Sequence, residues 1–68
     1  MKVAVKIFAG EMKNKEVELP EGSAYYDLLD LLKINPETVV VFKEGVPVAF
    51  DAPVDMTPLE IMRVVSGG

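Results

Sequence analysis

Cysteine and histidine are both absent from this chain of 68 residues. Without cysteine it has no disulfide, no zinc–thiolate site and no thiol nucleophile, and without histidine it lacks the commonest general base and metal ligand. We therefore expect no catalytic residue, no metal site and no cofactor bound by the chain itself. An enzyme in its own right is the least favoured class of protein.

Two further shortages bear on possible partners. Seven basic residues stand against eleven acidic ones, a net charge of −4, and the lysines are scattered rather than gathered into a stripe. This pattern argues against nucleic-acid binding. No apolar run approaches the ~20 residues that cross a bilayer, and the N-terminal apolar stretch is too short for a signal peptide. We expect a cytoplasmic protein without membrane contacts.

Alternating apolar residues predict strands at both ends of the chain. At the start, Val3, Val5 and Ile7 fall on one face of a strand and Phe8 on the other. We expect the first and last strands to lie side by side at the centre of a sheet, because both are strongly apolar. The predicted strands span residues 2–8, 15–19, 38–43, 46–48 and 59–65, with a polar connection at 9–14 inside an opening hairpin.

One helix is predicted over residues 24–33. Apolar residues recur there at helical spacing from Tyr25 to Leu32, and Ser23 stands where its side chain can cap the first turn. A helix packed across one face of a mixed four- to five-stranded sheet is the α+β arrangement that this order of elements favours. Residues 1–65 would form the domain and residues 66–68 a flexible tail.

The same alternation predicts an apolar patch on the other face of the sheet. If the neighbours of Val40, Phe42, Met62 and Val64 in the sequence face the core, these four side chains face outward. Should their two strands be adjacent, the four would form an exposed patch of the kind that marks protein interaction sites. The alternative is that a loop or self-association covers this face.

Two pairs of carboxylates are weak candidates for a site. Asp27 and Asp30 stand three residues apart on the predicted helix, and Asp51 and Asp55 lie in a loop without a third ligand. Metal sites for hard cations take more oxygen ligands than either pair supplies. We expect both pairs to be solvated surface.

The sequence closes on Ser66, Gly67 and Gly68, directly after the last predicted strand. Glycine lacks a Cβ, so this end can adopt backbone angles closed to other residues and can enter a narrow channel. Four extended residues from Val65 onward would reach about 13 Å beyond the domain. We expect Gly67 and Gly68 to present a terminal carboxylate to an activating enzyme; the alternative is an ordinary frayed end.

Several features occur together along nearly the whole chain. They are the opening hairpin, Gly22-Ser23 before a Leu28-Leu29 helix, the stretch from Asn35 to Val41, the Glu44-Gly45 turn, and Arg63-Val64-Val65-Ser66-Gly67-Gly68. In this combination they resemble the β-grasp ubiquitin-like sulfur carriers and modifiers. The stretch from Asn35 to Val41, together with the Val-Val-Ser-Gly-Gly end, is most similar to the thiamin-pathway sulfur carrier. The length is similar to that of the small archaeal modifier proteins. The small subunit of molybdopterin synthase shares the diglycine end but is usually longer.

The resemblance implies chemistry that partners supply. An ATP-dependent adenylyltransferase of the ubiquitin-activating type would adenylate the Gly68 carboxylate. A sulfur donor such as a cysteine desulfurase persulfide would then yield a thiocarboxylate for a downstream acceptor enzyme in thiamin, molybdopterin or tRNA thiolation. Alternatively, a lysine of a target protein would capture the activated carbonyl in an isopeptide bond. These two fates share every sequence feature. A non-covalent ubiquitin-like binding module is the alternative of another class.

Overall fold

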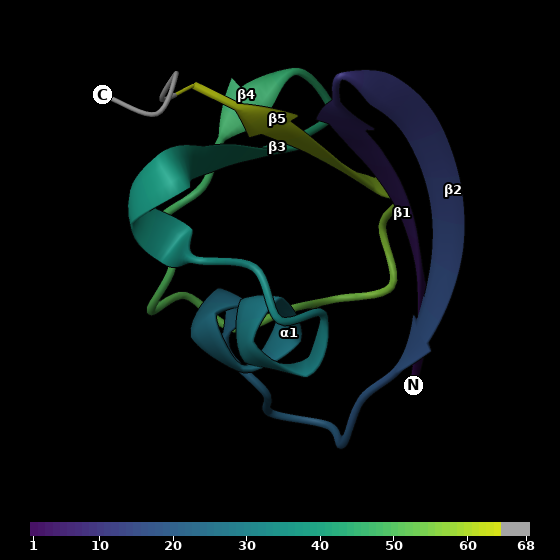
Figure 1. The fold of residues 1–68 in the computed structure, drawn as a ribbon. Coiled ribbons are helices and arrows are strands. Elements are labelled where there is room, and N and C mark those ends of the chain that lie inside the picture. The colour runs from purple at the N-terminus through teal and green to yellow at the C-terminus, as the bar shows by residue number, and fades with distance from the viewer. Residues whose placement is uncertain (65–68) are drawn as a thin grey trace.

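The computed structural model describes residues 1–64, in which a five-stranded sheet curves around one helix (Figure 1). The elements are β1 (Lys2–Ala9), β2 (Glu11–Glu18), α1 (Tyr25–Leu31), the 3₁₀ turn η1 (Pro36–Thr38), β3 (Val39–Lys43), β4 (Val46–Pro47) and β5 (Leu59–Arg63). The strand order is β2-β1-β5-β3-β4, in which β1 and β5 run parallel and every other pair is antiparallel. The predicted α+β fold, with the first and last strands paired at its centre, is confirmed. The predicted tail and Val65 lie outside the described residues.

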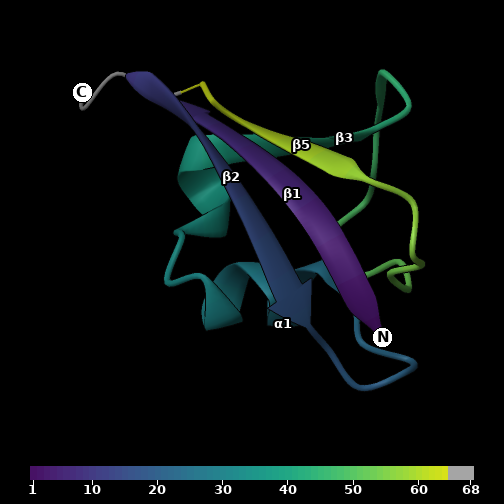
Figure 2. The same ribbon diagram turned by 90° about the vertical axis from the view of Figure 1, so that its right-hand side faces the viewer.

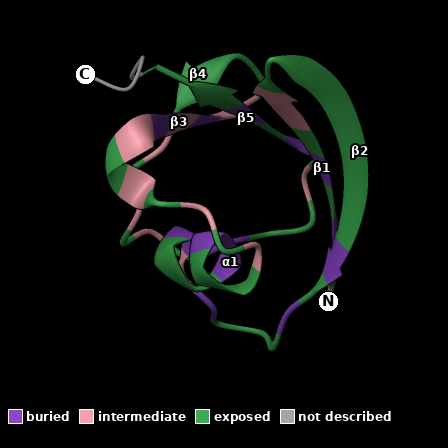
Figure 3. Cartoon of the chain, viewed as in Figure 1, coloured by how far each residue is buried: buried purple, intermediate pink, exposed green. Residues whose placement is uncertain are grey.

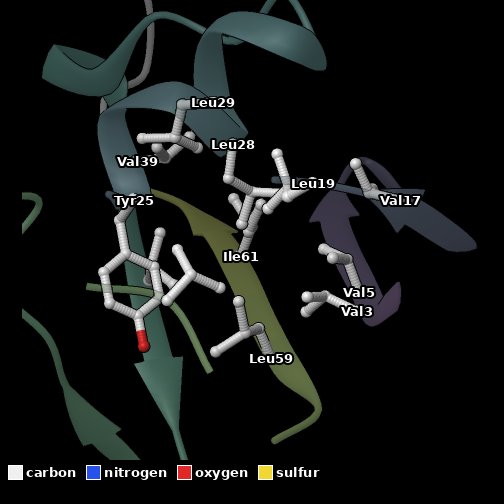
Figure 4. Packing of buried hydrophobic residues seen from close by; sticks show 12 residues of the cluster. Val3, Val5, Val17, Leu19, Tyr25, Leu28, Leu29, Val39, Leu59 and Ile61 are labelled. Atoms are coloured by element: carbon white, nitrogen blue, oxygen red, sulfur yellow. The ribbon is translucent and has the colours of Figure 1, made fainter. Parts of the chain in front are cut away.

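The core lies between α1 and the inner face of the sheet. The register places Val5 of β1 beside Leu59 of β5, and Ile61 of β5 beside Val41 of β3, so buried side chains form rows across adjacent strands. Leu28 and Leu29 of α1 close over these rows, and all of these residues are at most 2% exposed (Figure 4). The full core cluster is Val3, Val5, Val17, Leu19, Tyr25, Leu28, Leu29, Val39, Val41, Val54, Leu59 and Ile61. Removing this apolar surface from water is the main stabilising contribution to such a fold.

The helix begins one residue later than the sequence predicts, and Ser23 is not its cap. Ala24 is the N-cap, and its backbone N–H donates to the Asp27 carboxylate at 2.8 Å. The Ser23 hydroxyl instead donates to the Pro20 carbonyl at 2.6 Å and closes the preceding turn. The helix also ends earlier than predicted, at Leu31, and Lys33 adopts a φ of +59° as the chain reverses.

Strand β2 starts four residues earlier than predicted. Gly10, with a φ of +87°, reverses the chain, and pairing with β1 runs unbroken from Ala9 opposite Glu11 to Lys2 opposite Glu18. Glycine takes this left-handed conformation without the steric penalty of a Cβ. The strand lies at the sheet edge, and only Val17 in it is buried (Figures 2 and 3). Its first half therefore has no apolar alternation for the sequence pattern to detect.

The connection from β4 to β5 holds the helix against the sheet. The Tyr26 N–H donates to the Phe50 carbonyl at 3.0 Å, and the Val54 N–H donates to the Ser23 carbonyl at 2.7 Å. The Tyr26 and Phe50 rings meet edge to face with centroids 5.5 Å apart. β4 itself is a two-residue edge strand that contains Pro47, a residue that sheets accept mainly at their edges because it cannot donate to the ladder.

Candidate functional site

Strands β3 and β5 are neighbours, which was the condition on which the predicted patch depends. Val40 lies opposite Met62 in the antiparallel register. Val40 and Phe42 are half-buried, whereas Met62 is 43% and Val64 56% exposed. The Val64 N–H donates to the Thr38 carbonyl at 2.9 Å, so pairing continues one step past β5. Among residues 1–64 no element covers this outer face, because α1 lies across the inner one (Figure 1).

The register extends this surface across two more strands. On the outer face Phe8 of β1 lies beside Met62 of β5, and Met12 of β2 lies beside Phe8. Met12, Phe8, Met62 and Val40 thus form one continuous row over four adjacent strands. Since neighbouring strands are about 4.8 Å apart, the row is roughly 15 Å long. We call this row, together with Phe42 and Val64, the sheet patch.

Sequence reasoning missed Phe8 and Met12 as members of the patch. The alternation did place Phe8 on the outer face, but its neighbour on the sheet follows from the parallel register of β1 and β5. Met12 fell in the predicted polar connection, which the structure shows to be strand. The short spacing across Gly10 could have predicted a tight hairpin, in which Met12 lies opposite Phe8.

Charged side chains border the patch on the same face. Lys6 of β1 lies between Asn14 of β2 and Glu60 of β5, and Glu60 lies opposite Phe42. Beyond Lys6 an open hollow of about 400 Å³ is lined by residues of β1, β2 and the start of β5, together with Glu44, Thr57 and Pro58. Its lining includes two lysines and two glutamates, so side chains of both charges border it. An apolar centre with a charged border is the usual composition of a protein-binding surface.

One side chain of each predicted carboxylate pair has a structural role, and among residues 1–64 no contact indicates a role for the other. Asp27 caps α1, as described above. Asp55 accepts a hydrogen bond from the Lys43 ammonium at 2.9 Å and another from the Thr57 N–H at 2.9 Å. Within the part of the chain that the structure describes, no group of three or more acidic side chains gathers as a metal site.

The ion pair of Lys43 and Asp55 shifts the pKa values around it. The hydrogen bond from Lys43, with a further one from Thr57, lowers the pKa of Asp55 from 3.8 to about 2. The same hydrogen bond raises the pKa of Lys43. Burial raises the pKa of the nearby Tyr25 hydroxyl, which is enclosed without a hydrogen-bond partner among residues 1–64. This cluster fastens the β4–β5 connection to β3, on the core side of the sheet and away from the sheet patch.

The predicted tail site cannot be placed, since Gly67 and Gly68 lie outside the described residues. What the structure does place is the point where the described chain ends. Val64 follows β5 directly and belongs to the sheet patch, so the described part of the chain ends within this apolar surface. Figure 1 shows β5 as the last described strand. A partner that covers the patch would be adjacent to whatever follows Val64.

The strand order and the single covering helix define the fold as ubiquitin-like. A ubiquitin-like protein from the hyperthermophilic archaeon Caldiarchaeum subterraneum superposes with a TM-score of 0.63 at 14% identity, over 98% of this chain and 100% of that one. At this identity the likeness establishes the fold. The predicted β-grasp architecture is therefore confirmed by comparison as well as by topology.

Sequence comparison gives the family. The family model described as Small archaeal modifier protein 2 matches residues 1–65, and the chain belongs to this family. It is 29% identical to Small archaeal modifier protein 2 of Haloferax volcanii over 68 residues, all of both chains. It is 41% identical to an uncharacterized protein of Archaeoglobus fulgidus, again over all of both chains.

Membership of a ubiquitin-like modifier family has general implications. Such proteins are generally not enzymes, and they have an activating enzyme and target molecules as partners. The sequence-based resemblance to this family is confirmed. In residues 1–64 no helix is long and apolar enough to cross a membrane.

Proposed function

We propose that this protein is a carrier that an ATP-dependent adenylyltransferase activates at the Gly68 carboxylate. The proposal rests on one combination above all: a family match over residues 1–65 followed by the diglycine. In the proposed reaction a Gly68 carboxylate oxygen attacks the α-phosphorus of ATP, pyrophosphate leaves, and an acyl-adenylate forms. The described side chains include no histidine or cysteine, so the enzyme supplies the catalytic groups.

The sheet patch is the proposed docking site for this enzyme. It is apolar at its centre and charged at its border, and it includes Val64, the last described residue before the end of the sequence. Exposed apolar patches of this kind are typical of protein interaction sites. Docking there would hold the last four residues within reach of a nucleotide site, since they span about 13 Å when extended.

Sulfur transfer is the first proposed fate of the adenylate. The terminal sulfur of a persulfide attacks the activated carbonyl and AMP leaves. A thiol then cleaves the resulting acyl disulfide, which leaves a thiocarboxylate on Gly68 and a disulfide on the donor. The thiocarboxylate would be the sulfur source for an acceptor in thiamin, molybdopterin or tRNA thiolation.

Conjugation is the second proposed fate, and the family name favours it. Both the matching family and the Haloferax volcanii relative are described as modifiers. In this reaction a lysine amine of a target protein attacks the same carbonyl, AMP leaves, the nitrogen loses a proton, and an isopeptide bond remains. Activation at Gly68 is common to both fates, so it is tested first.

Mass spectrometry of the protein from its native host separates these possibilities. Replacement of one carboxylate oxygen by sulfur increases the mass by nearly as much as the oxidation of one methionine. Alkylation of the thiocarboxylate before the measurement therefore distinguishes a thiocarboxylate from an oxidised methionine. An alkylated C-terminus that is missing from a variant without Gly68 would establish the sulfur carrier. Tryptic Val-Val-Ser-Gly-Gly remnants, released by cleavage after Arg63, on lysines of other proteins would establish the modifier.

A third outcome would remove the proposal. If a competent activating enzyme, ATP and a sulfur donor produce neither product, activation at Gly68 is wrong. The protein would then be a non-covalent binding module, whose partners bind the Gly68-deleted variant as well as the complete chain. Deletion of Gly68 alters no residue that the core or the sheet patch contains, so a loss of activity on deletion reflects the chemistry of the end itself.

A further inference from the structure

Two methionines flank Phe8 at the centre of the sheet patch. Met12 and Met62 lie in register on either side of it, and their exposed fractions are 56% and 43%. Both side chains are therefore accessible to solvent while the patch is free. A partner that docks on the patch would have to bury both.

Methionine is the only side chain of this protein that contains sulfur, because the chain has four methionines and no cysteine. A two-electron oxidant such as hydrogen peroxide transfers one oxygen to the thioether. The sulfur is oxidised to a sulfoxide and the peroxide is reduced to water. The product replaces a flexible apolar side chain with a polar one, which disrupts methionine-rich interfaces, and sulfoxide reductases reverse the change.

We propose that Met12 and Met62 make docking on the sheet patch sensitive to oxidation. Sulfoxides at these two positions place strong hydrogen-bond acceptors on both sides of Phe8, in the surface that the activating enzyme would cover. Burying such a group without a donor opposes binding. The inference rests on the proposed function, since it assumes that the patch is the docking site.

The other methionines differ in ways that make this effect specific. Met1 is half-buried and packs against the core. Met56 is 69% exposed, more than either patch methionine, but it lies in the connection before β5 and outside the row. Met56 is thus an internal control, because it should oxidise as readily as the patch methionines without any effect on docking.

The test uses three proteins: the natural chain, the Met12→Leu/Met62→Leu double variant and the Met56→Leu variant. Each is treated with hydrogen peroxide, freed of peroxide, and analysed by peptide mass spectrometry for sulfoxide at each methionine. ATP–pyrophosphate exchange by the activating enzyme is then measured against carrier concentration, before and after oxidation. Each protein is compared with its own unoxidised form, and NMR spectra check that oxidation leaves the core folded.

We expect oxidation to raise the KM for the natural chain about tenfold, since a polar group is buried unpaired at the interface. The Met56→Leu variant should behave like the natural chain both before and after oxidation. The KM of the double variant should be the same before and after oxidation, because leucine keeps the apolar volume and cannot be oxidised. Treatment of the oxidised natural chain with a sulfoxide reductase and a dithiol should restore the original KM.

Three results would overturn the inference. One is an unchanged KM when Met12 and Met62 are both fully sulfoxide. Another is a rise in KM for the double variant equal to that of the natural chain. The third is resistance of Met12 and Met62 to peroxide under conditions that oxidise Met56. Failure of the proposed function has a different signature, which is no exchange with the unoxidised chain at any concentration.

Discussion

Ile61 and Met62 are adjacent in β5, yet they lie on opposite faces of the sheet. Ile61 is fully buried beneath α1, whereas Met62 is 43% exposed on the face that no described element covers. The inner face is built from valine, leucine and isoleucine, which pack closely in few rotamers. The outer row contains two methionines and a phenylalanine, side chains that adapt to different surfaces. The difference indicates that the inner face maintains the fold, and it supports the proposal that the outer face meets partners.

The prediction with the largest expected effect concerns the packing of the inner face. Ile61→Ala should lower the free energy of unfolding by about 2–5 kcal/mol, because it leaves a cavity under α1. Met62→Ala, the neighbouring change on the outer face, should lower it far less, within about 1 kcal/mol. Urea denaturation followed by circular dichroism measures both. If Ile61→Ala does not fold, Ile61→Val should cost about 0.5–1.5 kcal/mol, and equal costs at the two positions would contradict the comparison.

The second prediction tests the outer face. Met62→Lys should weaken docking of the activating enzyme about tenfold or more, which corresponds to about 1.4 kcal/mol, because a charge would enter the apolar row. Met56→Lys introduces the same charge at a more exposed methionine outside the patch and should leave docking unchanged. Titration calorimetry with the enzyme compares the two. Equal weakening by both variants would mean that net charge, and not the patch, governs the interaction.

The third prediction has a smaller expected effect and concerns the hydrogen bond at the start of α1, the helix that covers the inner face. Asp27→Ala removes the acceptor for the Ala24 N–H and should lower the free energy of unfolding by about 1 kcal/mol. Asp30→Ala, at an exposed position three residues later, is the matched control. Thermal unfolding distinguishes them. Docking on the opposite side of the sheet should be the same for both variants.

The smallest effect concerns the Lys43–Asp55 pair. Since the folded pKa of Asp55, about 2, is below its ordinary 3.8, the ionised carboxylate stabilises the folded state. This contribution is present above about pH 4 and is lost as the pH falls through the folded pKa. Asp55→Asn should therefore slightly lower the urea midpoint at pH 7, and the gap to the natural chain should close below pH 2. If the difference in urea midpoint between the variant and the natural chain persists at low pH, the lost stability would be due to packing and not to charge.

Sequence reasoning recovered the inner face better than the outer one, and the reason is physical. Burial under α1 imposes alternation on β1, β3 and β5, so their strands and the pairing of β1 with β5 could be predicted. Residues 11–14 of β2 have no covering element, hence no alternation, and they were assigned to a connection. The cap was misassigned because Ser23 is a preferred residue type for this position, whereas the N-cap is Ala24, whose own side chain cannot cap and whose N–H donates to Asp27.

The site was predictable in part for the same reason. Val40, Phe42, Met62 and Val64 follow from the alternation of two strands. Phe8 joins them through the parallel register of β1 and β5, and Met12 through the hairpin that turns at Gly10. The role of the patch as a docking surface stays a prediction, as does the activation of Gly68. Both depend on partners that no feature of this chain alone can specify.

The length of the outer row limits how partners follow one another. A partner at a typical stable interface covers about 800 Å² on each side, which is enough to cover the whole row of roughly 15 Å. Two proteins that recognise the row therefore cannot bind it at the same time. A carrier with a single such surface would have to leave its activating enzyme before it engages an acceptor, so the order of events in its cycle would be set by occupancy of Met12, Phe8, Met62 and Val40.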